Sequence, residues 1–300
     1  MYNMFFDNYD TPVFRPPSEA RSFILRVTRG CAHNHCTYCN MYRGVQFCVL
    51  TDEEIAYQIA MAERYGKNQV RRVFLADGDA LVLSTEKLLK ILAVLKEKFP
   101  KLQRVSSYAA PKDILRKSVE ELRQLYDAGL QLLYYGMESG DDVTLKAVKK
   151  GVSGPEAVEA GRRVRQAGMK LSMMIILGLA GVEGSERHAL ETAKAINEIK
   201  PTHLSALCLM LYRGSELKDQ FEAGLFNPLS PGGLMDELYM IIKNVDLPEG
   251  THCLFRSNHV SNYVQFAATL PKEKEPLLKE ITMASQELHK LKHWDVYNYD

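Results

Sequence analysis

Residues 23–43 read Phe23-Ile-Leu-Arg-Val-Thr-Arg-Gly-Cys-Ala-His-Asn-His-Cys-Thr-Tyr-Cys-Asn-Met-Tyr-Arg43, an apolar run followed directly by three closely spaced cysteines. Three thiolates, here from Cys31, Cys36 and Cys39, can hold three irons of a [4Fe–4S] cube and leave the fourth iron open to a ligand that is not protein. A closed electron-transfer cluster or a structural zinc normally has a fourth protein ligand at comparable spacing. The segment therefore predicts a reactive iron–sulfur cluster directly after a strand.

A zinc site is the alternative interpretation of the same residues, with His33 or His35 completing a Cys3His tetrahedron. Zinc ligands usually come as two short pairs on opposing turns, and the sequence has no second pair. The other three cysteines, Cys48, Cys208 and Cys253, are isolated from one another, and Cys208 lies in an apolar run typical of a core. The spacing favours iron–sulfur over zinc and leaves zinc open.

Length and composition limit the class of protein. A chain of 300 residues suits one large α/β barrel or two smaller domains. Its 46% hydrophobic and 25% charged residues are ordinary for a soluble globular protein, and a net charge of +1 gives no strong sign of a nucleic-acid or acidic-membrane partner. No apolar stretch approaches the length that spans a bilayer, and residues 1–10 lack the features of a secretory signal. We expect a cytoplasmic protein.

Short apolar runs alternate with amphipathic segments along most of the chain. Each run is nearly continuous, as expected when both faces of a parallel sheet are covered. A capping box at Thr51-Asp-Glu-Glu54 opens a helix through Arg64, and Ser84 and Ser118 cap the next two helices. The expected strands are 23–28, 72–76, 105–108, 130–136, 170–177 and 203–210, and later helices are expected over 155–168, from Ser185 to before Pro201, over 232–244 and over 272–292.

Six successive strand–helix units predict an α/β fold, a partial (β/α)6 TIM-like barrel with a C-terminal helical or irregular extension. A doubly wound open sheet is the alternative. Barrel enzymes bind ligands on the loops that follow the carboxyl ends of their strands. The cysteine segment lies there, together with the polar or glycine-bearing loops 77–79, 136–140, 178–181 and 213–215. We therefore expect these loops to form one site.

Five motifs occur in this order: the cysteine loop with Tyr38 before its last cysteine, Phe74-Leu-Ala-Asp-Gly-Asp79, Tyr135-Gly-Met-Glu-Ser-Gly140 followed by Lys149-Lys-Gly151, Ile175-Ile-Leu-Gly-Leu-Ala-Gly181, and Tyr212-Arg-Gly-Ser-Glu-Leu217. Together they resemble the radical S-adenosylmethionine (radical SAM) superfamily over about 23–217. The chain is most similar to the subgroup of oxygen-independent coproporphyrinogen oxidases and methylthiotransferases. It departs from the usual pattern by one extra residue between the first two cysteines, and by Asp79 where many members carry glutamate.

The resemblance implies a [4Fe–4S] cluster on Cys31, Cys36 and Cys39, with S-adenosylmethionine chelating the open iron. One electron then breaks the bond from sulfur to C5′, and the 5′-deoxyadenosyl radical abstracts hydrogen from an unidentified small substrate. The electron comes from a donor such as flavodoxin or ferredoxin. Rival interpretations are a porphyrinogen-type oxidative decarboxylase of the same superfamily and a non-enzymatic, zinc-stabilised binding protein.

The resemblance also implies cofactor contacts. Gly78 and Asp79 would contact the ammonium, Glu138 the ribose hydroxyls or the ammonium, with Ser139 as a substitute, and Lys150 the carboxylate. Tyr38 and the backbone around Ile176 would pack on adenine. Each side chain has a plainer alternative: Glu138 as a surface carboxylate, Lys150 as a solvated lysine at a helix end, and Tyr38 as ordinary packing.

The implied domains are an N-terminal extension over 1–20, a radical SAM core barrel over 21–225 and a C-terminal extension over 226–300 that covers the barrel. The extension carries Arg256, Asn258, His259 and Asn262 close together. Buried groups of this kind need partners, so they either tie the extension to the barrel wall or face the cavity. In the second case Arg256 and His259 are candidate catalytic residues that hold an acidic group of the substrate.

Overall fold

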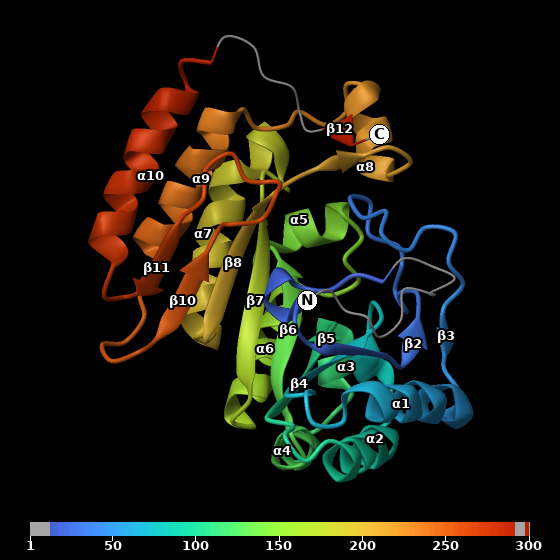
Figure 1. Cartoon of the computed structure of the whole chain (residues 1–300). Coiled ribbons are helices and arrows are strands. Elements are labelled where there is room, and N and C mark those ends of the chain that lie inside the picture. The colour runs from blue at the N-terminus through green and yellow to red at the C-terminus, as the bar shows by residue number, and fades with distance from the viewer. Residues whose placement is uncertain (1–12, 292–297, 300) are drawn as a thin grey trace.

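The computed structural model describes residues 13–291 and the backbone of 298–299 (Figure 1). The expectations for residues 1–10, most of the 1–20 extension and the last residue of the helix expected over 272–292 lie outside this range. An eight-stranded sheet forms the centre of the molecule, in the order β1-β4-β5-β6-β7-β8-β10-β11. Its strands are β1 Phe23–Arg26, β4 Arg72–Ala76, β5 Arg104–Ala109, β6 Leu130–Glu138, β7 Lys170–Leu177, β8 His203–Cys208, β10 Cys253–Arg256 and β11 Ala267–Leu270.

The first seven strands of this sheet are parallel, and β11 pairs antiparallel with β10. The sheet begins at β1 and ends at β11, which are not paired with each other. The α/β partial-barrel prediction is therefore confirmed, and the open edge means that the barrel is not closed. The carboxyl ends of the parallel strands meet along one edge, which we call the carboxyl edge.

Helices connect the strands. They are α1 Asp52–Gly66, α2 Thr85–Lys98, α3 Pro111–Leu115, α4 Val119–Asp127, α5 Asp142–Ala147, α6 Gly154–Gln166, α7 Gly181–Ile199, α8 Glu216–Glu222, α9 Pro231–Asn244 and α10 Lys274–Leu288. Two 3-10 turns, Pro17–Glu19 and Ala80–Val82, and two small strand pairs, β2 Thr28–Arg29 with β3 Cys48–Val49 and β9 Leu211–Tyr212 with β12 Asn298–Tyr299, complete the description. Among the described residues, no helix combines the length and apolarity that crossing a membrane requires.

The predicted helix caps are confirmed at Thr51, Ser84 and Ser118, whose side chains each accept a backbone hydrogen bond from the first turn. The prediction that the helix after β7 starts at Ser185 is wrong, because α7 already begins at Gly181. Its N-cap residue, Ala180, makes no side-chain capping bond, so the sequence carries no polar signal at the true start. Ser185 lies inside the helix and donates a hydrogen bond to Glu237 instead.

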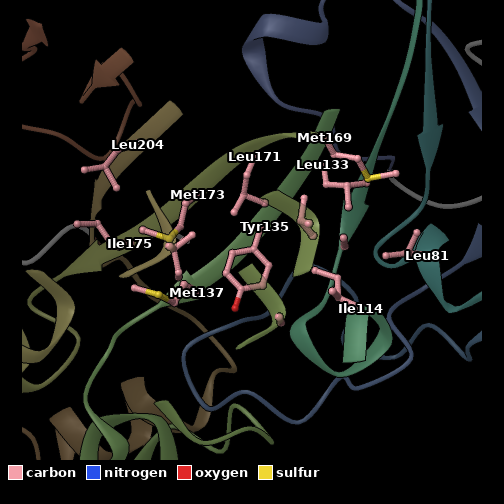
Figure 2. Packing of buried hydrophobic residues seen from close by; sticks show 14 of the residues in the cluster. Leu81, Ile114, Leu133, Tyr135, Met137, Met169, Leu171, Met173, Ile175 and Leu204 are labelled. Atoms are coloured by element: carbon pink, nitrogen blue, oxygen red, sulfur yellow. The ribbon is translucent and has the colours of Figure 1, made fainter. Parts of the chain in front are cut away.

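Alternate residues of the strands face opposite sides of the sheet. Leu133 and Tyr135 of β6 belong to the large core between the sheet and its helices, shown in Figure 2. Leu132 and Tyr134 pack with Phe74 in a second cluster on the other face. We call the side that carries Leu132 and Tyr134 the inner face of the sheet. The connecting helices cover the opposite side, the outer face.

The chain after residue 225 extends this sheet. β10 pairs with β8, so that Arg256 lies opposite Ser205, and β11 pairs with β10. Helix α9 packs against α7, and α10 packs against α9, as Figure 1 shows in orange and red. The sequence predicts a helical or irregular extension here and neither of the two strands. Each has only four residues, too short a pattern to separate from a loop.

Candidate functional site

The cysteine loop joins β2 to β3 at the carboxyl edge of the sheet. Cys31, Cys36 and Cys39 are free, half-buried thiols. Cys36 contributes to raising the pKa of Cys31, and Cys36 and Cys31 contribute to raising the pKa of Cys39, so the three lie close together. Burial raises the pKa of Cys31, and it raises the pKa of Cys39 to about 11. A cluster binds thiolates, so its assembly here would displace these protons. The donor set fits an iron–sulfur cluster with three protein ligands.

The histidines of this loop have other contacts. His33 Nε2 lies 2.7 Å from the carbonyl oxygen of Lys149, and the His33 and His35 rings pack edge to face with centroids 5.6 Å apart. Within the described part of the chain, no three side chains of His, Cys, Asp or Glu are gathered so that they could hold a single metal ion.

Asp77, directly after β4, joins the two ends of the cysteine loop. Its Oδ2 accepts hydrogen bonds from Arg26 Nη2 at 2.9 Å and from the backbone N of Gly30 at 3.3 Å. Its Oδ1 accepts one from the hydroxyl of Tyr42. Gly30 precedes the first cysteine and Tyr42 follows the last, so one fully buried carboxylate fixes both ends. From the sequence, Asp77 is predicted only to lie in a polar loop; its position directly after a buried strand is the signal that could identify it.

Gly78 and Asp79 follow at the same place. A Cβ atom on Gly78 would lie 2.7 Å from the Tyr42 ring, so glycine lets this turn approach the cysteine loop. Asp79 is 1% exposed, and its Oδ1 has no hydrogen-bond partner. Burial and the neighbouring carboxyl of Asp113 raise the pKa of Asp79 well above its ordinary value, and Asp79 in turn raises that of Cys31. An unpartnered buried oxygen beside the cysteines fits a site for a cationic group.

Tyr38, Glu138 and Lys150 come together from three segments. Lys150 Nζ lies 3.0 Å from Glu138 Oε1 and 3.5 Å from the Tyr38 hydroxyl. Both charged side chains are mostly buried, at 13% and 12% exposure, so neither is a solvated surface group. Burial by itself would lower the pKa of Lys150, but Glu138 and Cys36 raise it above its ordinary value. The cation therefore stays charged beside the cysteine loop.

The backbone at Glu138 is unusual. Its φ of +67° lies in the left-handed region, which is uncommon for a residue other than glycine. The pairing of β6 with β7 shifts between Gly136 and Glu138, so the strand is irregular where the side chain enters the site. Such a conformation persists only when its surroundings hold it.

The remaining predicted cofactor residues are placed differently. Ser139 is fully buried, and its hydroxyl contacts His188 Nδ1 at 2.7 Å and accepts from the backbone N of Asp141 at 2.9 Å. Its hydroxyl is thus engaged by other protein groups. Ile176 of β7 is half-buried and packs against a small apolar cluster. Tyr38, whose hydroxyl lies 3.5 Å from Lys150 Nζ, packs against the same cluster.

Polar residues of the C-terminal extension (226–300), which we call the tail, differ in their contacts. Asn262 ties the tail to β8, because its Oδ1 accepts from the backbone N of Cys208 at 3.0 Å and its Nδ2 donates to the carbonyl of Ala206 at 2.8 Å. Arg256 ends β10 on its exposed side, opposite Ser205 on the inner face, and donates to the carbonyl of Phe255 at 2.6 Å. Asn258, in the loop after β10, is exposed.

His259 lies in the same loop, at the carboxyl edge. Its Nδ1 accepts a hydrogen bond from the backbone N of Ser261 at 3.2 Å. Burial lowers the pKa of His259, so the ring tends toward its neutral form. Arg256 and His259 are thus near the carboxyl edge, but in the described part of the chain neither makes a hydrogen bond or ion pair with the cysteine loop.

Comparison with known proteins agrees with this geometry. The Radical SAM superfamily model matches residues 25–193. The curated heme chaperone HemW of Bacillus subtilis (strain 168) is 21% identical over 226 residues, which cover 72% of this chain and 58% of HemW, so this chain spans little more than half of that relative.

Two solved structures share the fold. The cobalamin-dependent S-adenosylmethionine radical enzyme OxsB, solved with aqua-cobalamin and S-adenosylmethionine bound, aligns with a TM-score of 0.51 and 19% identity over 75% of this chain and 31% of OxsB. The coproporphyrinogen III oxidase HemN of Escherichia coli aligns with a TM-score of 0.53 and 16% identity over 74% of this chain and 51% of HemN. Because the family model matches more than half of its residues, this chain belongs to the radical SAM superfamily of enzymes, which use a [4Fe–4S] cluster and S-adenosylmethionine.

Proposed function

We propose that Cys31, Cys36 and Cys39 hold the cluster and that the Tyr38–Glu138–Lys150 group binds S-adenosylmethionine for radical chemistry on a small substrate. The observation that carries this proposal is the meeting of these side chains at one edge. Lys150 interacts electrostatically with Cys36 and Cys39, although it follows β6 and the cysteines follow β1. When bound, the cluster supplies the electron that splits S-adenosylmethionine into methionine and a 5′-deoxyadenosyl radical.

The Glu138–Lys150 pair complements the amino acid end of S-adenosylmethionine. That end carries one ammonium and one carboxylate, and the pair offers one carboxylate and one ammonium in a mostly buried place. Lys150 would bind the carboxylate, and Glu138 the ammonium or the ribose hydroxyls. Charge-assisted hydrogen bonds of this kind are stronger than neutral ones. Asp79, with its unpartnered oxygen, and the Gly78 turn would supply a second contact to the ammonium.

Tyr38 and Ile176 would pack on the adenine ring, since both belong to the same apolar cluster. The Ser139 hydroxyl contacts His188 and the backbone N of Asp141, so Ser139 would hold the loop next to Glu138 rather than contact the cofactor. The left-handed backbone at Glu138 then directs the carboxylate into the site. Together these groups bind and orient the cofactor and exclude water from it.

An acidic electron carrier such as flavodoxin or ferredoxin would approach the cysteine loop from outside. Arg43 is exposed on this loop and donates to the carbonyls of Cys36 at 3.1 Å and Cys39 at 3.2 Å. We further propose that residues 21–225 form the catalytic core and 226–300 cover it, that Arg256 and His259 contact the substrate, and that the protein works in the cytoplasm.

Anaerobic reconstitution tests the proposal. The wild type should become brown and contain about four irons and four sulfides per chain. With dithionite and S-adenosylmethionine it should release 5′-deoxyadenosine. Changing Cys31, Cys36 or Cys39 to Ala should abolish both properties, whereas Cys48→Ala, at an exposed thiol outside the group, should leave them intact. A colourless protein that retains zinc instead of iron would overturn the proposal.

A further inference from the structure

A buried histidine and a buried glutamate lie behind the proposed cofactor site. His188 of α7 and Glu237 of α9 are 0% and 1% exposed, and His188 Nε2 lies 3.6 Å from Glu237 Oε1. The nitrogen has no hydrogen-bond partner in this arrangement, because 3.6 Å is too long for a hydrogen bond. Burying two titratable groups is costly, and neither group contacts the cysteines or the Glu138–Lys150 pair directly.

Helix α7 holds the loop that follows Glu138 by three successive contacts. His188 Nδ1 contacts the hydroxyl of Ser139 at 2.7 Å, and Thr192 Oγ1 accepts from the backbone N of Gly140 at 3.0 Å. Arg187 Nε donates to both carboxylate oxygens of Asp141 at 3.0 Å.

The approach of loop and helix is close. A Cβ atom on Gly140 would lie 2.3 Å from the carbonyl oxygen of Glu191, so only glycine lets the loop reach α7. The three contacts fix the residues that immediately follow Glu138 against a regular helix. They account for the left-handed backbone at Glu138, which needs such support.

Glu237 holds the other loop of the proposed site. Its Oε1 accepts from the backbone N of Gly178 at 2.6 Å, and its Oε2 accepts from Ser185. Gly178 begins the turn after β7, next to Ile176. Burial raises the pKa of Glu237, and the neighbouring His188 opposes this shift. The Glu237 carboxylate therefore joins the β7 turn to α7 and α9.

We propose that His188 and Glu237 are positioning residues that hold the Glu138 loop and the Gly178 turn in the geometry that binds S-adenosylmethionine. Helix α9 belongs to the tail, so the tail supports the cofactor site through Glu237. The inference rests on the proposed function, because it presumes that Glu138 and the β7 turn contact the cofactor. Positioning errors of an ångström can cost large factors in activity.

Two substitutions of His188 separate the two sides of the network. Asparagine places an amide near the Nδ1 position but removes the part of the ring that lies next to Glu237, whereas glutamine reaches toward the Nε2 position but removes the contact to Ser139. His188→Asn, His188→Gln and Glu237→Gln should each retain the cluster and the thermal midpoint within a few degrees. Each should raise the Kd for S-adenosylmethionine about tenfold or more, because the loops lose their fixed orientation. The change in the electron paramagnetic resonance signal of the reduced cluster on adding S-adenosylmethionine should weaken in parallel.

His289→Gln is the matched control. His289, at the end of α10, places its Nε2 2.7 Å from Oδ2 of Asp236 on helix α9, so this is a second histidine–carboxylate pair that involves α9, but a half-exposed one. This variant should bind S-adenosylmethionine like the wild type. A Kd within twofold of the wild type for folded His188 and Glu237 variants would overturn the inference.

Arg187→Gln keeps the test decisive if the buried variants do not fold. Arg187 is 48% exposed, so its loss costs little stability, yet it holds Asp141. It should raise the same Kd several-fold, and an unchanged Kd would also overturn the inference. Failure of the proposed function has a different outcome, because the wild type itself would then release no 5′-deoxyadenosine.

Discussion

The hydroxyl of Tyr42 donates a hydrogen bond to Asp77, although 35 residues separate them. The other carboxylate oxygen of Asp77 accepts from Gly30 N and Arg26, so the two ends of the cysteine loop are attached to the end of β4. A loop with three cysteines has many conformations, and closing it costs conformational entropy before any iron binds. The Tyr42–Asp77 hydrogen bond already restricts the loop in the absence of iron, so part of this entropy is lost before the cluster binds.

Asp77→Asn should therefore weaken both cluster assembly and the fold. The amide has the same size, but it leaves the buried guanidinium of Arg26 without the negative charge of Asp77, and Arg26 and Asp77 are 3% and 0% exposed. Breaking a buried ion pair in this way costs about 3–5 kcal/mol. Denaturant unfolding of the apoprotein and the iron content after reconstitution measure the two effects. Tyr42→Phe should cost only about 1 kcal/mol, because it removes one hydrogen bond. Full iron loading and unchanged stability in Asp77→Asn would contradict this prediction.

Glu138→Gln should retain the cluster and weaken S-adenosylmethionine binding by about 1–3 kcal/mol, the usual cost of a lost buried polar partner. Isothermal titration of the reconstituted protein with S-adenosylmethionine measures the change. Lys149→Asn is the matched control. Lys149 precedes Lys150, the partner of Glu138, in the chain, and its own ion pair with Glu216, with the charged atoms 2.7 Å apart, is largely exposed. Asparagine also tolerates the positive φ of +54° at that position. If the Glu138 variant binds like the control, Glu138 does not contact the cofactor.

Asp79→Asn should make the stability of the apoprotein less dependent on pH. Burial and Asp113 raise the pKa of Asp79 above its ordinary value of 3.8, so the folded chain binds this proton more tightly than the unfolded chain. The stability that protonated Asp79 contributes is fully present below the pKa of this group in the unfolded chain. It is lost as the pH rises through the pKa in the folded chain, by at most about 1.4 kcal/mol per pH unit. In urea unfolding the variant should therefore lose less stability than the wild type as the pH rises above the ordinary carboxyl value of 3.8.

A second carboxyl variant separates stability from binding at this position. Asp113→Asn should also reduce the loss of stability with pH, because it removes the like charge next to Asp79. It should leave S-adenosylmethionine binding intact, whereas Asp79→Asn should weaken it. Equal binding by both variants would exclude Asp79 as a contact for the ammonium.

Arg256→Ala and His259→Ala should each leave the cluster content and the uncoupled release of 5′-deoxyadenosine near the wild-type level. Both should abolish any stimulation of that release by a deproteinised cell extract, which supplies small-molecule substrates. Asn262→Ala provides the contrast, because it breaks hydrogen bonds to Cys208 and Ala206 and should lower the thermal midpoint. Loss of cluster in the Arg256 and His259 variants would indicate a structural role for them as well.

Features that depend only on neighbouring residues can be predicted from the amino-acid sequence. The strands 72–76 and 170–177 were predicted with the bounds that the structure has, because each is a short apolar run between polar residues. The caps at Thr51 and Ser118 are local hydrogen-bond motifs and are confirmed. The spacing of Cys31, Cys36 and Cys39 is also local, and it pointed to the family.

Side chains that are distant in sequence support the site through contacts that form only in the tertiary structure. Asp77 meets Tyr42, and His188 meets Ser139 and Glu237, because strands and helices far apart in sequence pack together. Apart from the position of Asp77 directly after a buried strand, no local pattern marks these partners, since each is a single polar residue in a helix or loop. β10 and β11 likewise become strands because the exposed edge of β8 offers unpaired backbone groups, which a four-residue segment satisfies only when the fold brings it there.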